Sequence, residues 1–508
     1  MTKSKHKIKN RFYIAAGLLF FIVVLYCATT DWFVSRFDIT LKEFLYTMLA
    51  PLKGAGTSFL PEAVRRILPS VLIFAVLWAA YSILDKKLRS RFDAKIVIGS
   101  EKKHISLSYF GIFKFCFFAL AVCAVIHFSV QLNQTFRISE FISSYVNRTT
   151  IYEERYISPD SVAVTAPEEK KNLIYIYLES MEVTYASKAD GGSQPRENYI
   201  SNLTSLAAEN ISFSSTDKLG GFQSISGTTW TMAALFSTTT GVPFSFPVGR
   251  NTMNQREIFA GGITSLGNIL EENGYRQEFL CGSDGDFAGR KSYFSQHGNY
   301  KIYDLFSARE DGYIPEDYFV WWGYEDAYLY EIAKDELTAL AKDTDSPFNF
   351  TMLTVDTHHV DGYVCDNCPS VYDEQLGNVL LCADSQVYEF VRWCMRQPFY
   401  ENTVIIISGD HPRMDTTLIG DVELRPIYNC FINTDKNAAE LNTQWRTFTT
   451  MDMFPTILSA LNFDIEGDRL GLGTDMFSGR QTLAEEMGLF TLDEELNKYS
   501  KFYISNFS

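Results

Sequence analysis

Residues 173–180 read LIYIYLES, an unbroken apolar run that ends in a glutamate and a serine. Short apolar and β-branched runs of this kind are typical of strands that are buried in a sheet. The run predicts a buried strand over residues 173–178, with the Glu179 carboxylate directly at its carboxyl end. A carboxylate buried there loses its hydration, and a bound cation can compensate for the energetic cost.

Three further runs predict strands, and each leads directly into polar residues: 277–281 before Gly-Ser-Asp-Gly-Asp, 348–355 before Asp-Thr-His-His, and 403–408 before Gly-Asp-His. Helical patterns lie between the predicted strands, at residues 200–209, 264–273, 326–342 and 384–396. This alternation predicts an α/β domain with a mostly parallel central sheet and helices on both faces.

The residues that follow these strands predict a metal site. Ligands gather beyond the carboxyl ends of the strands in such sheets. Carboxylate oxygens together with an imidazole suit manganese, magnesium or zinc. We therefore predict that Glu179, Asp410 and His411 bind one divalent cation. A turn or N-cap role would explain any single acid as well, so the prediction depends on the recurrence of this pattern at several strands.

A glycine- and threonine-rich segment, GGFQSISGTTWT at residues 220–231, precedes a helix-like apolar pattern at residues 232–240. Thr231 would stand at the start of that helix. Unpaired backbone N–H groups and the helix dipole favour an anion there, so a phosphate could bind beside the hydroxyl. A plain N-cap threonine is the alternative interpretation. Contact with a metal ion would turn the hydroxyl into a nucleophile.

Three apolar stretches, residues 12–29, 67–84 and 109–130, have about the length that a bilayer core requires and predict transmembrane helices. Basic residues are concentrated before the first stretch and between the second and third, which predicts that both segments are cytoplasmic. The predicted organisation is a membrane anchor at 1–130, a juxtamembrane linker at 131–171 and an extracytoplasmic catalytic domain at 172–508.

The composition supports a folded domain and excludes one class of partner. Hydrophobic residues make up 46% of the 508 residues, which is enough to form a sizeable core. The net charge is −16, and several basic residues open the chain, so the acidity lies mostly in its C-terminal two-thirds. This charge argues against a nucleic-acid partner, because phosphate backbones are held by basic surfaces.

Five segments carry a resemblance to a known family: YIYLESMEVTY, GTTWTMAALFSTTTGVPF, TVDTHHVDGY, IIISGDH and LGLGTDMFS. They resemble the phosphoglycerol transferases that modify osmoregulated periplasmic glucans. Those enzymes are related to lipoteichoic-acid synthases and phosphoethanolamine transferases in the alkaline-phosphatase and sulfatase superfamily. The resemblance implies a sulfatase-like fold and transfer of phosphoglycerol from phosphatidylglycerol to a periplasmic glucan or other surface glycan. It also implies a phosphothreonine intermediate and a single divalent metal.

The resemblance assigns roles residue by residue. Glu179, Asp410 and His411 match the family's metal ligands, for which manganese is the first choice and magnesium or zinc the alternatives. Thr231 matches the threonine that coordinates the metal and receives the phosphoglycerol group. The threonine-rich stretch aligns in more than one way, so Thr228 and Thr229 remain less favoured nucleophiles.

Two further residues match substrate contacts in the family. His358 matches a histidine that contacts the substrate phosphate or the leaving oxygen, and Arg290 matches a substrate-binding arginine. His359 is left unassigned. The chain departs from the family in having three predicted membrane helices where four or five are usual. It also lacks the C/S-x-P-x-R motif of true sulfatases, which argues against sulfate ester hydrolysis.

The same motifs leave three rival functions open. Phosphoethanolamine transfer and phosphodiester hydrolysis would use the same metal and threonine. A catalytically silent membrane sensor would not need them, and the intact set of Glu179, Thr231, Asp410 and His411 argues against it.

Cys365 and Cys368 form a CxxC, and Cys382 follows nearby. The pair could indicate a zinc or redox function, but no second CxxC completes a zinc site. In an oxidising periplasm a disulfide is the better interpretation, and Cys368 with Cys382 is the preferred pair.

Overall fold

The structure is a computed structural model that describes residues 138–507 apart from 246–257 and 421. It also describes two strands at 95–100 and 103–108 and scattered residues between 21 and 134. The three predicted membrane spans fall mainly outside these described residues. Within the described part of the chain, none of the helices combines the length and the apolar character that crossing a bilayer requires. The membrane anchor and the domain boundaries stay predictions.

The larger C-terminal unit is built on one sheet of seven strands, in the order β5-β10-β9-β4-β8-β6-β7. Five neighbouring strands, β9 to β7, run parallel, and β10 is antiparallel to both β9 and β5. The predicted mostly parallel sheet is therefore confirmed. The strands are β4 (Asn172–Leu178), β5 (Gly221–Phe222), β6 (Arg276–Cys281), β7 (Lys301–Tyr303), β8 (Phe348–Leu353), β9 (Thr403–Gly409) and β10 (Ile427–Ile432).

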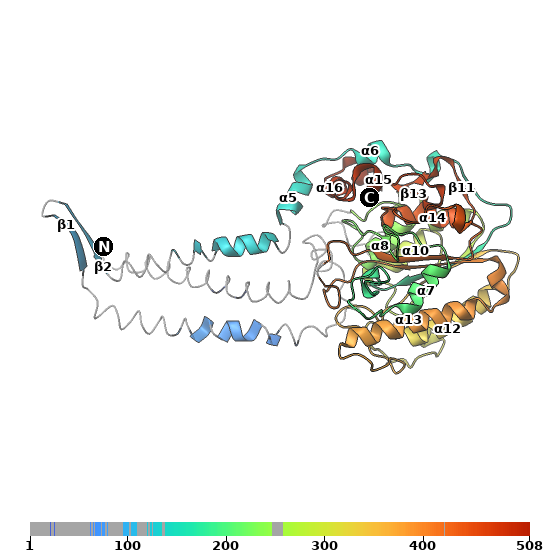
Figure 1. The fold of residues 1–508 in the computed structure, drawn as a ribbon, viewed down its shortest axis with the longest axis horizontal. Helices are drawn as coiled ribbons and strands as arrows, with labels where there is room; N and C mark the ends of the chain where they lie inside the picture. Colours follow the sequence, from blue (N-terminus) through green and yellow to red (C-terminus); the bar gives the residue numbers. More distant parts are fainter. Residues whose placement is uncertain are drawn as a thin grey trace. The chain divides into compact units, whose positions relative to one another are not determined.

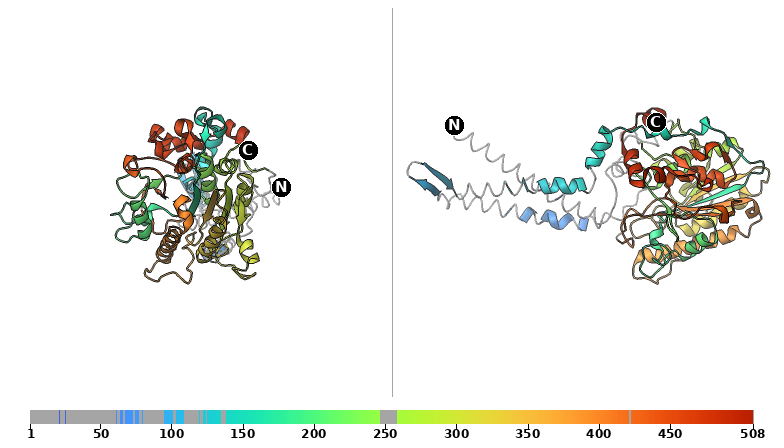
Figure 2. Two further views of the ribbon diagram at one scale, coloured as in Figure 1. Left: turned by 90° about the vertical axis from the view of Figure 1, so that its right-hand side faces the viewer. Right: turned by 45° about the horizontal axis from the view of Figure 1, so that its top comes forward.

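Helices cover both faces of this sheet (Figures 1 and 2). Alternate residues of β4 enter two separate cores: Tyr175 and Tyr177 pack in one, and Ile174 and Ile176 pack in the other. The first core includes side chains of α8 (Thr231–Thr240), α9 (Leu266–Glu272), α10 (Arg290–Gln296) and α14 (Met453–Ala460). The second includes side chains of α7 (Ser201–Glu209), α11 (Leu305–Glu310), α12 (Asp326–Leu340) and α13 (Gln375–Cys394).

Smaller elements complete the described chain. The hairpin of β1 (Lys95–Ser100) and β2 (Lys103–Ser108) is antiparallel and belongs to a separate N-terminal unit. Two further two-stranded pairs join β3 (Val164–Thr165) to β11 (Asp464–Ile465) and β12 (Arg469–Leu470) to β13 (Gly473–Thr474). Further helices are α5 (Ile138–Val146), α6 (Ile151–Arg155), α15 (Leu483–Met487), α16 (Leu489–Asn497) and α17 (Lys501–Phe507).

Part of the segment predicted as a juxtamembrane linker packs against the sheet domain. Tyr152 of α6 is buried, and its ring centroid lies 5.3 Å from that of Tyr503 in α17. The pairing of β3 with β11 also anchors the segment after α6 to the domain.

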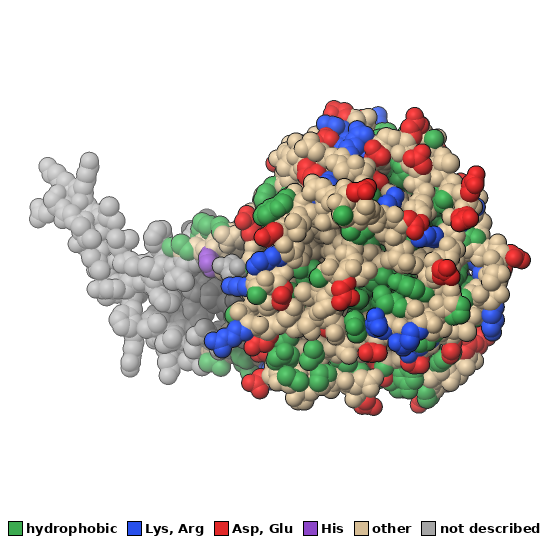
Figure 3. Space-filling model, turned by 45° about the vertical axis from the view of Figure 1, so that its right-hand side comes forward, with side chains coloured by type: hydrophobic (Ala, Val, Ile, Leu, Met, Phe, Trp, Pro, Cys, Tyr) green, Lys and Arg blue, Asp and Glu red, His purple; other side chains and the backbone are tan. Residues whose placement is uncertain are grey.

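Acidic and basic side chains are interspersed over the face of the domain in Figure 3.

The buried carboxyl of Asp384 should make the stability of the domain depend on pH. Its carboxylate accepts hydrogen bonds from the backbone N–H groups of Asn202 (3.0 Å) and Leu203 (2.8 Å) at the start of α7. Burial raises the pKa of Asp384 from 3.8 to about 6. The folded chain therefore holds this proton more tightly than the unfolded chain, and the associated stability is lost as the pH rises through about 6.

We expect wild type to lose stability relative to Asp384→Asn between pH 4 and pH 7, by on the order of 2 kcal/mol. Melting temperatures of the two chains across this range would measure the effect. Asp435→Asn is the control that should show almost no pH dependence over this range, because hydrogen bonding to Lys171 lowers the pKa of Asp435 and keeps it ionised throughout. A pH-independent difference between wild type and Asp384→Asn would contradict the prediction.

Candidate metal centre and active site

The site lies at the carboxyl ends of three neighbouring parallel strands, β9, β4 and β8. Leu178 of β4 pairs with Gly409 of β9, and Tyr177 pairs with Leu353 of β8. The segments that follow these strands therefore leave the sheet at the same level. This register brings Glu179 beside Asp410, although 231 residues separate them in the chain.

A strained turn fixes Glu179. Ser180 adopts a left-handed backbone conformation with φ of 51°, which residues other than glycine rarely adopt. In this conformation its backbone N–H donates to Asp410 Oδ1 (2.8 Å) and its hydroxyl donates to Glu179 Oε1 (2.7 Å). Strain of this kind persists where the surroundings enforce it, and it is common at functional sites.

His411 presents its Nε2 atom to the site. Its Nδ1 atom lies 2.7 Å from the carbonyl oxygen of Pro412. Because a carbonyl can only accept, Nδ1 carries a proton, and in the neutral ring Nε2 keeps its lone pair. Nε2 lies 3.4 Å from Asp410 Oδ2 and 3.6 Å from Glu179 Oε1. This is the tautomer that a metal-binding histidine requires.

Of the three threonines considered as nucleophile, the structure brings Thr231 to this group. Its hydroxyl oxygen, at the first residue of α8, lies 3.3 Å from Glu179 Oε2 and 3.3 Å from His411 Nε2. Thr228 is buried, and its hydroxyl donates instead to the carbonyl of Ile225 at 2.9 Å. The Thr229 hydroxyl has no hydrogen-bond partner in the part of the chain that is described.

The electrostatics of the group fit a cation. Oxygen and nitrogen atoms of Glu179, Asp410 and His411 all lie within 4.8 Å of one another, and the three side chains are almost fully buried. Burial, together with the Glu179 carboxylate, raises the pKa of Asp410 to about 7. Asp410 Oδ2 has no hydrogen-bond partner among the described residues. Two adjacent buried carboxylates and an imidazole lone pair form a donor set that suits a divalent cation.

The pKa of Glu179 is shifted in the other direction. Burial acts to raise it, but His358 and His411, the Ser180 hydroxyl and then Arg413 outweigh the burial, and the pKa is lowered. Of the two carboxyls, Glu179 is therefore the one that stays ionised most readily.

His358 lies in the loop after β8. This loop is tied to the site through Thr357, whose hydroxyl donates to the carbonyl of Glu179 at 2.5 Å. The His358 ring packs against Trp322, with centroids 4.5 Å apart, and its Nδ1 donates to the carbonyl of His359 at 2.7 Å. Burial lowers the pKa of His358, although Glu179 acts in the opposite direction. Burial therefore favours the neutral form of the His358 ring.

Arg290 is the buried first residue of α10. Its Nη2 atom donates to Ser283 Oγ and to the Asp284 carbonyl, both at 2.9 Å. The guanidinium lies 5.5 Å from the centroid of the Phe287 ring, which in turn lies 5.4 Å from that of Trp322. Arg290 is thus connected to His358 through two aromatic rings. Its contact with a substrate stays a prediction.

Sequence reasoning missed Arg413, which is 1% exposed. Its guanidinium donates to Asp415 Oδ2 at 2.9 Å and to the carbonyl of Thr357, so it joins the segment after β9 to the His358 loop. Its backbone N–H donates to Glu182 at 3.1 Å. The sequence offered two signals for this residue. One is the Pro-Arg pair directly after Asp410 and His411, and the other is a second glutamate, Glu182, in the segment LESMEV.

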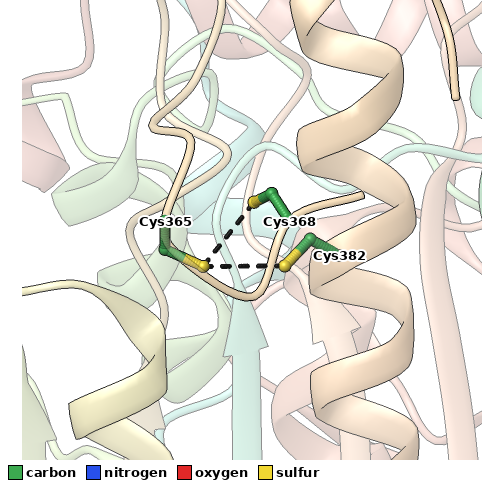
Figure 4. A group of neighbouring side chains, drawn as sticks. All are labelled: Cys365, Cys368 and Cys382. Carbon is green, nitrogen blue, oxygen red and sulfur yellow. Dashed lines mark hydrogen bonds between the residues drawn. The ribbon is translucent and has the colours of Figure 1, made fainter. Parts of the chain in front are cut away.

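The predicted disulfide residues form a group of three. Cys365, Cys368 and Cys382 are free thiols in the structure, and Cys365 lies between the other two (Figure 4). Its sulfur is 3.6 Å from that of Cys368 and 3.7 Å from that of Cys382. A bond between Cys368 and Cys382 stays a prediction.

Comparison with known proteins identifies the fold family. The sulfatase family profile matches residues 171–463, which is more than half of the chain. The chain belongs to the sulfatase family. The matched range contains Glu179, Thr231, Asp410 and His411, so the candidate site lies within the sulfatase domain itself.

Two curated relatives of this sulfatase-family chain share one name. The chain is 29% identical over 491 residues to "Phosphoglycerol transferase I" of Salmonella choleraesuis, covering 94% of this chain and 58% of the relative. It is 28% identical to the protein of the same name from Escherichia coli O127:H6, covering 96% of this chain and 63% of the relative. The chain therefore spans about three-fifths of the length of these relatives.

Two solved bacterial structures are among those that match this chain. The lipoteichoic acid synthase LtaP of Listeria monocytogenes matches with a TM-score of 0.47 and 20% identity, covering 62% of this chain and 79% of that one. The lipooligosaccharide phosphoethanolamine transferase EptA of Neisseria meningitidis matches with a TM-score of 0.49 and 15% identity, covering 92% of this chain and 87% of that one.

Proposed function

We propose that this sulfatase-family chain is an enzyme that transfers phosphoglycerol from phosphatidylglycerol to a surface glycan, in the first place a periplasmic glucan. The observation that carries the proposal is the Thr231 hydroxyl, which lies 3.3 Å from both Glu179 Oε2 and His411 Nε2. The name of the relatives, which match along 94% of this chain or more, supports phosphoglycerol as the transferred group.

The first half of the proposed reaction uses Thr231 as nucleophile. Its hydroxyl oxygen forms a bond to the lipid phosphorus, and the bond from phosphorus to the diacylglycerol oxygen breaks. Thr231 gives its hydroxyl proton to solvent, and His358 orients the leaving diacylglycerol oxygen or passes it a proton from solvent. Unpaired backbone N–H groups at the start of α8 favour the negative charge that gathers on the phosphate oxygens.

The second half returns the chain to its starting state. A glycan hydroxyl attacks the phosphorus of phosphothreonine 231, the bond from phosphorus to the threonine oxygen breaks, and the glycan proton returns to Thr231. A bound divalent cation, with manganese as the first choice and magnesium or zinc as alternatives, would lower the pKa of the Thr231 hydroxyl and offset phosphate charge. Glu179, Asp410 and His411 are the residues that would hold it.

The proposed location follows from the donor. Phosphatidylglycerol is confined to a membrane, and the apolar stretches within residues 1–130 support a multi-pass anchor. The basic segments beside those stretches support a catalytic domain that faces the periplasm. An anchored domain would meet its donor in the plane of the bilayer.

The proposal is tested by offering the full chain two lipids together, phosphatidylglycerol and phosphatidylethanolamine, each labelled in its head group, with a periplasmic glucan as acceptor. We expect the glycerol label to move to the glucan and the ethanolamine label to stay in the lipid. Mass spectrometry of the glucan would measure both. Transfer of ethanolamine, or release of free glycerophosphate without any acceptor, would contradict the proposal.

A further inference from the structure

The three thiols after β8 form a cluster that the proposed reaction does not use. Cys365 and Cys368 belong to one tight turn, in which the Cys368 N–H donates to the Cys365 carbonyl at 3.0 Å. Cys382 comes from α13, and its sulfur faces this turn (Figure 4). Cys365 and Cys382 are buried, and Cys368 is partly exposed. The cluster thus joins two elements that are distinct in the fold.

The spacing of the sulfurs fits a shared metal ion. The sulfur of Cys365 lies 3.6 Å and 3.7 Å from the other two. Two sulfurs that each lie about 2.3 Å from a tetrahedral zinc ion are about 3.8 Å apart. The group also lies within 4.8 Å as a whole, so one ion can reach all three sulfurs.

A hydrogen-bond donor beside the cluster suits a thiolate. The side-chain amide of Gln386, one turn along α13, donates to the Cys382 sulfur at 3.2 Å. Donors of this kind stabilise metal-bound sulfur and orient it.

We propose that Cys365, Cys368 and Cys382, in place of the disulfide predicted from the sequence, bind a second cation, a thiophilic divalent ion such as Zn²⁺, at a site separate from the one at Glu179. Each thiol gives its proton to solvent on binding, and a water molecule completes four ligands at the partly exposed side. The ion would clamp the end of the His358 loop onto α13. Soft sulfur ligands favour zinc over manganese or magnesium, so the two sites would select different metals.

Cobalt separates the two sites, because thiolate ligands give Co²⁺ an intense near-ultraviolet charge-transfer band and the Glu179 site contains no sulfur. The reduced, metal-free full chain would be titrated with Co²⁺. We expect one equivalent to produce the thiolate band and added Zn²⁺ to remove it. Cys365→Ser should lose the band. Cys368→Ser should also lose it, and this substitution should disturb the fold less because Cys368 is partly exposed. Cys394→Ser, on the same helix but outside the cluster, should keep it.

Two results would overturn the proposal. One is spectroscopic: the reduced wild-type chain shows no thiolate band, or the band survives in Cys365→Ser. The other is peptide mapping of the unreduced native chain that finds a disulfide among the three cysteines, since the oxidised pair could not bind the ion. Both results leave the phosphoglycerol transfer proposal untouched, because that reaction uses none of these thiols.

Discussion

Thr231→Ala is expected to lower phosphoglycerol transfer by at least about a thousandfold, because no other group can take over the covalent step. The substitution removes the hydroxyl that lies between Glu179 and His411. It leaves the helix start intact, since Thr231 is the first helical residue and the N-cap position belongs to Trp230. Initial rates of labelled phosphoglycerol transfer to a glycan, with the melting temperature as a check on folding, would measure the effect.

Three further measurements make the experiment specific. Thr231→Ser keeps a hydroxyl and should keep part of the rate. Thr228→Ala should keep most of the rate and lose stability, because the Thr228 hydroxyl bonds to the Ile225 turn. Rapid quenching should trap phosphoglycerol on residue 231 of the wild type, detectable by peptide mass, and not in Thr231→Ala. If the Thr231→Ala chain transferred phosphoglycerol within about tenfold of the wild-type rate, this nucleophile would be refuted.

The sequence predicted those parts of the fold whose signal is local. Apolar runs such as residues 173–178 and 403–408 became β4 and β9, and the polar residues after them met at one edge because the strands are parallel. The strand β10, residues 427–432, was missed although IYNCFI is apolar, since a short apolar run alone does not separate strand from helix.

One helix boundary was wrong for a local reason. The predicted helix at 384–396 is α13, which begins nine residues earlier at Gln375. Gly377 and Asn378 lower the helix propensity of that first part. Its buried side chains, such as Leu380, stabilise it through packing against the sheet, and packing of that kind has no local signal.

Site residues that directly follow a predicted strand could be predicted from the sequence. Residues that belong to the site only through a long-range contact could not. Glu179, Asp410 and His411 belong to the first class. Arg413 belongs to the second, because its hydrogen bond to the Thr357 carbonyl joins segments 56 residues apart. The cysteines show the same limit. Spacing could identify the group, but only the fold shows that Cys365 lies between the other two.

Removal of the cation should abolish transfer. We expect the chain treated with a chelator to lose at least about 99% of its rate, since charge stabilisation by a metal contributes several kcal/mol to such reactions. Adding back manganese, magnesium and zinc in turn would show which ion restores it. Asp410→Asn should reduce both the metal content of the purified chain and the rate, whereas Asp384→Asn, a buried carboxylate elsewhere, should reduce neither.

Asp410→Asn is a conservative change for the fold, which makes a loss of rate informative. Oδ1 of Asp410 accepts from the backbone N–H groups of Ser180 and His411, both at 2.8 Å, and an asparagine oxygen can accept both bonds. What the variant removes is the negative charge at Oδ2, the atom without a hydrogen-bond partner in the described chain. A variant that retained full rate and metal content would contradict the ligand assignment.

The metal-free chain offers an independent test of the same carboxyl that requires no activity. Without a cation, burial and the neighbouring Glu179 raise the pKa of Asp410 from 3.8 to about 7. The folded chain then binds this proton more tightly than the unfolded chain, so the stability it contributes is lost as the pH rises through about 7. Relative to Asp410→Asn, metal-free wild type should therefore melt at a lower temperature at pH 8 than at pH 5. A bound cation replaces the proton, so saturating metal should remove this dependence. If the dependence were the same with and without metal, Asp410 would not be a ligand.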